Sequence, residues 1–241
     1  MAVSAPVPRR ANGLVTVADV ITAPRDAFQT LRVSPMWGWA FIIAVLLTAI
    51  GQYLGTPATI HAIQASWPAQ VAANPQLAGA SPQAQQNALN ISTSVIRVAW
   101  LFAPVIVLIG AFIASIVMLI FRSMGGDAGY KQLWCAAMNI AVVSAGIGSL
   151  VNGLIAVVRG PASYSSTADA YRAIPSLAWL APHAGVKLSA FLAGFGVINI
   201  WAAVLTAMAM VYVARTSKAA AAVCAFVILC CLSAFLAWGA R

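Results

Sequence analysis

Residues 100–121, WLFAPVIVLIGAFIASIVMLIF, form an apolar run that contains no charged side chain. As a helix rising 1.5 Å per residue, a run of this length covers roughly 30 Å, which is the thickness of the hydrocarbon core of a bilayer. A charged residue placed at the centre of such a helix costs on the order of 3 kcal/mol by insertion scales. This stretch therefore predicts a transmembrane helix, and it decides the class of fold for the whole chain.

The composition of the chain extends that conclusion to all 241 residues. Hydrophobic residues make up 62% of the sequence and charged residues 7%, with a mean hydropathy of +0.92. A soluble domain cannot bury so much apolar surface. The sequence predicts an all-α, polytopic integral membrane protein, with a tail at 1–36 and a membrane domain at 37–239. The five predicted spans are approximately 37–55, 99–121, 133–158, 188–213 and 219–239.

The basic residues near the span ends predict the orientation. With an odd number of spans, Arg9, Arg10, Arg25, Arg32, Arg122, Lys131, Arg215 and Lys218 fall on one side of the membrane, and the other Lys and Arg residues on the opposite side. The positive-inside rule then places the N-terminus in the cytoplasm and the C-terminus outside, in a cell inner (plasma) membrane. The net charge of +9 is explained by side chains that meet lipid headgroups, so no nucleic-acid partner is expected.

A short amphipathic helix is predicted just before the first span. Pro24 suits the first turn of a helix. From there Ala27, Phe28 and Leu31 share one face, and Arg25, Gln29 and Arg32 share the other. We expect this helix to lie at the membrane interface, with its apolar face against lipid or against the bundle. Its basic face would bind anionic lipid or a partner protein, and the sequence does not choose between them.

The connections between spans differ in character. The segment 57–97 is rich in Ala and Gln and predicts a polar loop with helical pieces, including a helix into the second span with Ser81 as N-cap and Pro82 at N1. The segment 159–187 predicts a short helix at the headgroups. The stretch 122–132 predicts a tight turn, in which glycines permit the reversal and Asp127 forms the turn or pairs with a nearby base.

Catalysis needs groups that this chain hardly has. It contains two histidines, His61 and His183, four aspartates and no glutamate. We find no catalytic motif, no metal-ligand spacing and no cofactor signature. No ionisable residue interrupts a predicted span, which argues against a proton-coupled transporter. The sequence therefore predicts a non-enzymatic protein without cofactor or metal, and an intramembrane enzyme with a Ser or Cys nucleophile is the weakest alternative.

Small and uncharged polar residues within spans three and four predict close helix packing. Side chains such as asparagine and serine hydrogen-bond between membrane helices, and glycine lets two backbones approach. Spans three and four are thus expected at the centre of the bundle or at a dimer face. The residues predicted to pack helices are Asn139, Ser144, Gly148, Asn152, Gly194, Asn199 and Trp201.

Four stretches in sequence order resemble bacterial members of the Yip (Ypt/Rab-interacting protein) family, which are five-span membrane proteins. They are ITAPRDAFQTLRVSPMWGWAFIIAVLL, SPQAQQNALNISTSVIRVAWLFAPVIVLIGAFIASIVMLIF, GGDAGYKQLWCAAMNIAVV, and FGVINIWAAVLTAMAM followed by ARTSKAAAAV. The resemblance implies a five-helix fold. Eukaryotic members are linked to Rab-type GTPases and to vesicle traffic, but their long N-terminal region is absent here, so that role is not carried over.

The predicted function is that of an adaptor, scaffold or membrane-organising factor. Its partners would be the lipid bilayer and another membrane protein or a second copy of the chain. The alternative is a small-solute channel or transporter subunit. The residues predicted to form the partner or lipid contact surface are Arg25, Phe28, Arg32, Asp127, Tyr130, Lys131, Arg215 and Lys218.

Overall fold

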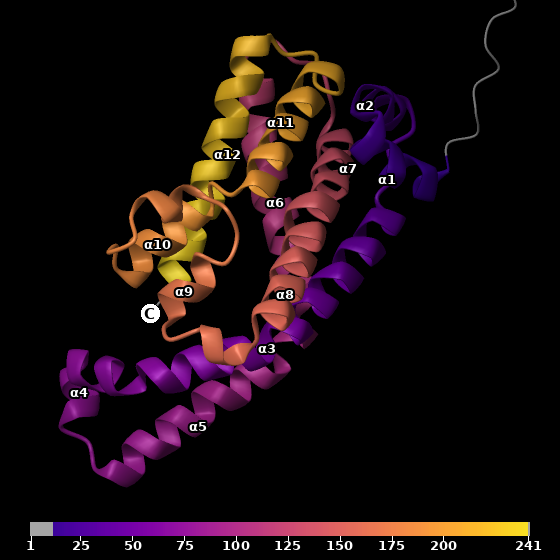
Figure 1. The fold of residues 1–241 in the computed structure, drawn as a ribbon. Coiled ribbons are helices and arrows are strands. Elements are labelled where there is room, and N and C mark those ends of the chain that lie inside the picture. Colours follow the sequence, from indigo (N-terminus) through magenta and orange to yellow (C-terminus); the bar gives the residue numbers. More distant parts are fainter. Residues whose placement is uncertain (1–11, 241) are drawn as a thin grey trace, which may run out of the picture.

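The computed structural model describes residues 12–240, and those residues form a helical bundle without strands (Figure 1). Four helical segments are long and apolar enough to cross a membrane, and a fifth is obtained when a bent helix pair counts as one span. The prediction of an all-α, multi-pass membrane protein is confirmed. The five spans are α3 (Gly38–Ala73), α6 (Ala103–Arg122), α7 (Tyr130–Ala141) with α8 (Gly148–Arg159), α10 (Val186–Ala193) with α11 (Val197–Tyr212), and α12 (Lys218–Gly239).

The first connection is more helical than the sequence predicted. Helix α3 continues to Ala73 through Pro57 and Pro68, and is followed by α4 (Pro75–Ala78) and α5 (Pro82–Val98). Alanine and glutamine are strong helix formers, which explains why helix persists around the two prolines. The predicted N-cap is present, because the Ser81 hydroxyl accepts a hydrogen bond from the Ala84 amide at 3.3 Å. Residues 56–98 thus form a helical arm that projects from the bundle (Figure 1).

The third and fourth spans are interrupted, although the sequence predicted two continuous helices. The third contains a π-helical turn, η2 (Val142–Ile147), between α7 and α8. The fourth bends by 48° between α10 and α11, across Gly194–Gly196. There the amide of Val197 donates to the Pro175 carbonyl at 3.4 Å, in place of a bond within the helix. Irregular backbone at membrane depth persists where protein or a cavity surrounds it.

Two helices precede the first span, and the sequence predicted only one. Helix α1 (Gly13–Thr22) comes first, and α2 (Pro24–Val33) matches the predicted amphipathic helix. The side chains of Ala27, Phe28 and Leu31 are buried in the same core cluster as the spans. Of the two expected environments for the apolar face of α2, lipid and the bundle, the structure shows the bundle.

The helices α3 and α8 cross at backbone contact. A Cβ atom placed on Gly51 would overlap the backbone of Ser149, and one placed on Gly153 would overlap the backbone of Gly51. Only glycine fits at both positions, so the two helices meet at backbone contact. Gly51 was not among the predicted packing residues, because the sequence does not show which helix lies opposite it.

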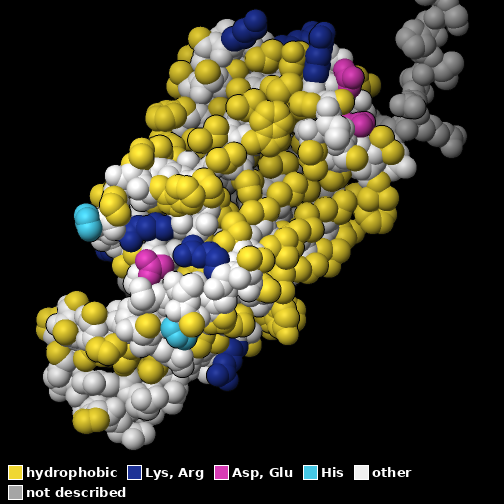
Figure 2. All heavy atoms as spheres, in the orientation of Figure 1, with side chains coloured by type: hydrophobic (Ala, Val, Ile, Leu, Met, Phe, Trp, Pro, Cys, Tyr) yellow, Lys and Arg dark blue, Asp and Glu magenta, His cyan; other side chains and the backbone are white. Residues whose placement is uncertain are grey.

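The bundle has two different ends. The basic end consists of α2, the loop 123–129 and the turn 213–217, and the opposite end carries the arm and a crossover segment, residues 160–185 (Figure 1). The crossover segment includes α9 (Thr167–Tyr171) and the 3-10 turn η4 (Leu177–Leu180), which matches the predicted short helix. Figure 2 shows mainly hydrophobic side chains between Lys and Arg at the two ends. These apolar flanks contact the lipid bilayer.

Aromatic pairs mark the two ends of the apolar zone. Trp37 and Trp134 meet edge to face at the basic end, with ring centroids 6.2 Å apart. Tyr53 and Trp100 meet in the same way where the arm leaves the bundle, at 6.4 Å. Tryptophan and tyrosine concentrate at the headgroup level of membranes. The second aromatic pair thus lies where the arm begins, on the side of the bundle opposite to the basic end.

Candidate functional site

At the basic end, a bidentate ion pair joins segments that are far apart in the sequence. The guanidinium of Arg32 donates from its two terminal nitrogens to the two carboxylate oxygens of Asp127, each at 2.9 Å. One of these nitrogens also donates to the carbonyl oxygen of Val213 at 2.6 Å. Paired bonds between charged groups are stronger and more directional than single ones. Arg32 thus ties α2 to the loop 123–129 and to the end of α11.

We call this contact between α2, the loop 123–129 and the end of α11 the charged joint. Backbone groups and one glutamine side chain add further hydrogen bonds to it. The amide of Asp127 donates to the carbonyl oxygen of Ala214 at 3.0 Å. The Gln132 side chain donates to the Arg32 carbonyl oxygen at 2.6 Å and accepts from the Gly129 amide at 2.7 Å. The stretch 122–132, which the sequence predicted as a tight turn, is therefore hydrogen-bonded both to α2 and to the turn 213–217. Three separate parts of the chain form one ordered surface.

The charges at the joint stabilise one another. The hydrogen bonds from Arg32 lower the pKa of the Asp127 carboxyl, with a smaller contribution from the charge of Arg215 at 3.9 Å. The hydrogen bond to Asp127 raises the pKa of Arg32. The lowered pKa keeps the Asp127 carboxyl ionised around neutral pH, and two arginines share this one carboxylate. The joint therefore keeps a net positive charge on its exposed side.

Most of the predicted contact residues lie on the exposed part of the basic end. The guanidinium of Arg25 lies over the Tyr212 ring, 5.7 Å from its centroid. The side chain of Arg215 is 67% exposed, and its backbone has a φ of 58° in the tight turn before α12. The other exposed members are Tyr130, Lys131 and Lys218. Six of the eight predicted contact residues are therefore exposed, namely these five and Asp127.

Phe28 does not belong to this surface. Its side chain is 0% exposed and packs in the core beneath α2. The period of the helix places Phe28 beside Leu31, and both point to the bundle because α2 is docked there rather than floating on lipid. Phe28 holds α2 in position on the bundle. A partner could reach the Phe28 side chain only if α2 moved away.

The predicted packing residues have three different environments. Asn139 is buried and donates to the carbonyl oxygens of Met36 at 3.1 Å and Cys135 at 2.8 Å, so it links the third span to the segment before α3. Gly194 is buried against Ser233 of α12, where a Cβ atom would overlap the serine side chain. Trp201 is 41% exposed on the outside of the bundle, facing lipid.

The other four predicted packing residues border a cavity, which Gly194 also lines. Ser144, Gly148, Asn152 and Asn199 line a space of about 390 Å³ between α6, the third span, α11 and α12. Glycine and alanine are frequent around it, so the helices leave volume where larger side chains would close it. The cavity was not predicted, because the sequence shows small residues but not whether a neighbouring helix reaches them.

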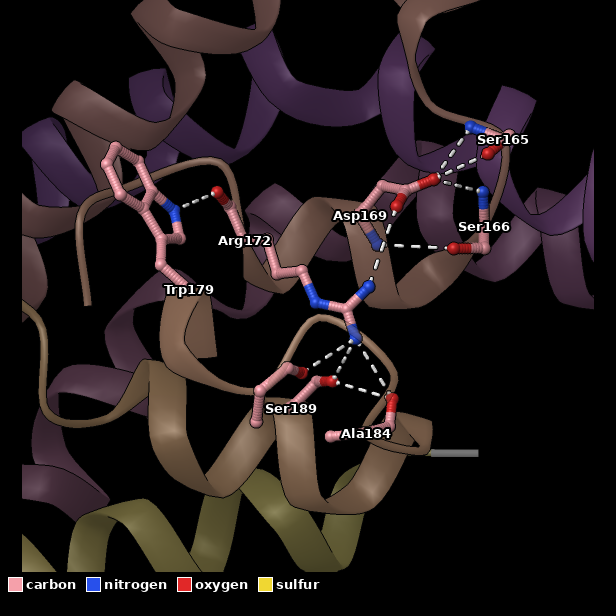
Figure 3. Close-up of polar contacts among 8 residues, drawn as sticks. Ser165, Ser166, Asp169, Arg172, Trp179, Ala184 and Ser189 are labelled. Carbon is pink, nitrogen blue, oxygen red and sulfur yellow. Dashed lines mark hydrogen bonds and ion pairs between the residues drawn. The ribbon is translucent and has the colours of Figure 1, made fainter. Parts of the chain in front are cut away.

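The crossover segment contains a second polar network that the sequence did not single out (Figure 3). Arg172 donates to the carbonyl oxygen of Ala184 and to the hydroxyl of Ser189, both at 3.0 Å, and lies 3.9 Å from Asp169. Burial alone would raise the pKa of Asp169, but hydrogen bonds from Ser165 and Ser166 lower it. The network fixes α9 to the start of α10, next to the cavity.

In the part of the chain that the structure describes, no cluster of side chains could support metal-dependent or cysteine-based catalysis. Between residues 12 and 240, no group of three or more His, Cys, Asp and Glu side chains comes together. Cys135 and Cys224 are buried and unpaired with any other cysteine. The two candidate functional sites are therefore the charged joint and the cavity.

Comparison with known proteins assigns a family but gives no close relative. Residues 18–239 match the sequence model of the Yip1 domain, and this range covers all five spans, the whole of α2 and the second half of α1. No curated protein matches significantly, and no solved structure does.

Proposed function

We propose that this chain, which belongs to the Yip1 domain family, is a non-enzymatic adaptor or scaffold that organises other proteins at the membrane through its basic end. The observation that carries the proposal is the joint of Arg32, Asp127 and Arg215, which links three separate segments into one positively charged surface. A preorganised surface binds a partner without an ordering cost.

The side chains around the joint determine what kind of partner fits. Lys131, Lys218 and Arg25 are exposed basic groups, and Tyr130 adds a half-exposed aromatic ring. Arginine and tyrosine are enriched at the energetic centres of protein interfaces, and basic rims attract acidic surfaces. The partner proposed here is an acidic segment of another membrane protein. The basic end would face the cytoplasm in an inner (plasma) membrane, and the C-terminus would lie outside.

Site-specific photocrosslinking in the native membrane tests this proposal. A photoreactive amino acid at Lys131 or Lys218 should give a defined crosslinked species, and the same amino acid at Lys187, near the other end, should not. Arg32→Gln should reduce crosslinking at both basic-end positions about tenfold, because α2 then loses its bidentate attachment to the loop. The reduction must occur while the thermal stability of the bundle stays close to that of the parent protein.

Two results would contradict the adaptor role. Equal crosslinking at the basic end and at Lys187 would show that the surface selects no partner. Transport of solute or ions by the purified full-length protein in liposomes would indicate a channel or transporter.

A further inference from the structure

The cavity in the middle of the bundle has the chemistry of a ligand site. Its volume of about 390 Å³ falls within the roughly 300–1,000 Å³ of small-molecule pockets. On α12 it extends from Ala225 to Leu236, which corresponds to about 16 Å along the helix. The space is thus long and narrow, and it lies within the membrane-spanning part of the bundle.

Both breaks in the spans border this cavity. The π-helical turn contributes Ser144 and Ala145, and the bend of the fourth span contributes Gly194 and Gly196. π-Helical turns are frequent at functional sites, and broken membrane helices frame binding sites in other membrane proteins. Two independent distortions that meet at one cavity indicate a shape maintained for an occupant.

The hydrogen-bonding groups in the wall fall into two classes. The hydroxyls of Thr206 and Ser233 donate to carbonyl oxygens one turn earlier in their own helices, at 2.9 and 2.8 Å. The carboxamides of Asn152 and Asn199 also line the cavity, and within residues 12–240 neither side chain has a hydrogen-bond partner. Asn152 is exposed and Asn199 half-buried, and each carboxamide offers two donors and an acceptor oxygen to a ligand in this space.

The wall excludes charged ligands. No Lys, Arg, Asp, Glu or His is among the lining residues, which are chiefly alanine, glycine, isoleucine and leucine. An ionised headgroup inside this space would have no compensating charge. A chain or ring of carbon atoms fits the apolar wall, and an uncharged hydroxyl or ester group fits the two asparagines.

The crossover segment borders the cavity as well. Tyr171 and Ile174 belong to the lining, and the neighbouring Arg172 fixes this segment to α10 through Ala184 and Ser189 (Figure 3). The polar end of an occupant would therefore be held beneath the crossover segment, with its apolar end directed toward the membrane centre.

We propose that the cavity binds a neutral single-chain lipid, with its uncharged hydroxyl or ester group on Asn152 and Asn199 and its hydrocarbon chain between α6, α11 and α12. This site is separate from the basic end and does not depend on the adaptor role. Its lipid would enter from the bilayer that surrounds the bundle.

A photoreactive monoacylglycerol with a diazirine in its chain tests the proposal on the full-length protein in nanodiscs. The expected result is labelling of cavity residues on α8, α11 or α12, competed by unlabelled monoacylglycerol. The matched lysophosphatidic acid probe, which has the same chain and a charged phosphate, should label the cavity about tenfold less, because the wall holds no cation.

Two variants locate the site. A Cβ atom on Gly110 has no neighbour within 4 Å, so Gly110→Leu should fill the cavity without a clash at Cβ and lower labelling about tenfold. The control is Gly38→Leu, which adds the same volume at another open position and should leave labelling unchanged. The double variant Asn152→Leu with Asn199→Leu should abolish the preference for monoacylglycerol over a purely alkyl diazirine probe, which keeps the test valid even if Gly110→Leu is unstable.

Several results would overturn the proposal. These are equal cavity labelling by the charged and neutral probes, labelling confined to lipid-facing residues such as Trp201, or labelling of a folded Gly110→Leu protein at the parent level. A cavity that holds only water would give the second of these patterns.

Discussion

The two faces of the third span use similar residues and reach opposite results. On one face Gly153 meets Gly51 of α3 so closely that neither position has room for a Cβ atom. On the other face Ser144, Gly148 and Asn152 border a cavity of about 390 Å³. A Cβ atom on Gly148 would lie 3.8 Å from Ile198, which is ordinary contact. Small residues allow helices to approach, but the residue opposite decides whether they do.

This difference bears on how glycine in membrane helices is interpreted. Close contact between backbones gains van der Waals attraction that lipid chains would otherwise supply. Around the cavity, which the π-helical turn and the bend of the fourth span border, the same small residues forgo that attraction. A glycine pattern alone therefore predicts possible proximity and not contact.

The largest effect is expected for Gly153→Leu. Its side chain would have to displace the backbone of Gly51, which cannot shift without separating α3 from α8. We expect a loss above about 3 kcal/mol, or failure to accumulate as folded protein. Thermal unfolding of the purified protein and its yield as a monodisperse species measure this. A stable Gly153→Leu protein would show that the crossing is not closely packed.

A smaller loss is expected for Gly194→Ala at the bend. The added methyl group would overlap the side chain of Ser233 on α12. We expect a destabilisation of about 1–3 kcal/mol, because the neighbour is partly a side chain that can move. Adding Ser233→Gly should restore part of the stability in a thermal unfolding experiment. If the second change gives no recovery, the two residues are not in contact.

Asn139→Leu tests a hydrogen bond in the closely packed part of the third span, away from the cavity. The change removes the bond to the Met36 carbonyl oxygen and leaves that part-buried oxygen without this donor. We expect a loss of about 1–2 kcal/mol in unfolding free energy, the usual range for hydrogen bonds between membrane helices. The measurement is thermal unfolding in detergent, with the Asn152 and Asn199 variants below as matched controls.

The smallest effect is expected for Asn152→Leu and Asn199→Leu, each made singly. Within the described residues these side chains make no hydrogen bond to protein, so their removal should change the stability of the empty protein by less than about 0.5 kcal/mol. The same thermal unfolding experiment applies. A loss as large as that of Asn139→Leu would mean that these asparagines join helices and would remove the contrast between the two faces.

The basic end shows how far local sequence patterns reach. The amphipathic helix at 24–32 was predicted from its period and its proline, and α2 begins at Pro24. The partner of its basic face was not predicted, because Arg32 and Asp127 are 95 positions apart. The inward position of Phe28 also depended on the docking of α2. Helical period identifies a face, but only the surrounding helices show what that face contacts.

The sequence by itself determined the membrane class, the five apolar spans, the N-cap at Ser81 and the family resemblance, because each depends on composition or on neighbours within a few residues. Tertiary structure alone decided the meeting of Gly51 with Gly153, the bends of spans three and four, the charged joint and the cavity. These features depend on which helices lie opposite each other. In a chain rich in Ala and Gly, many helix pairings are sterically allowed, so local pattern cannot select among them.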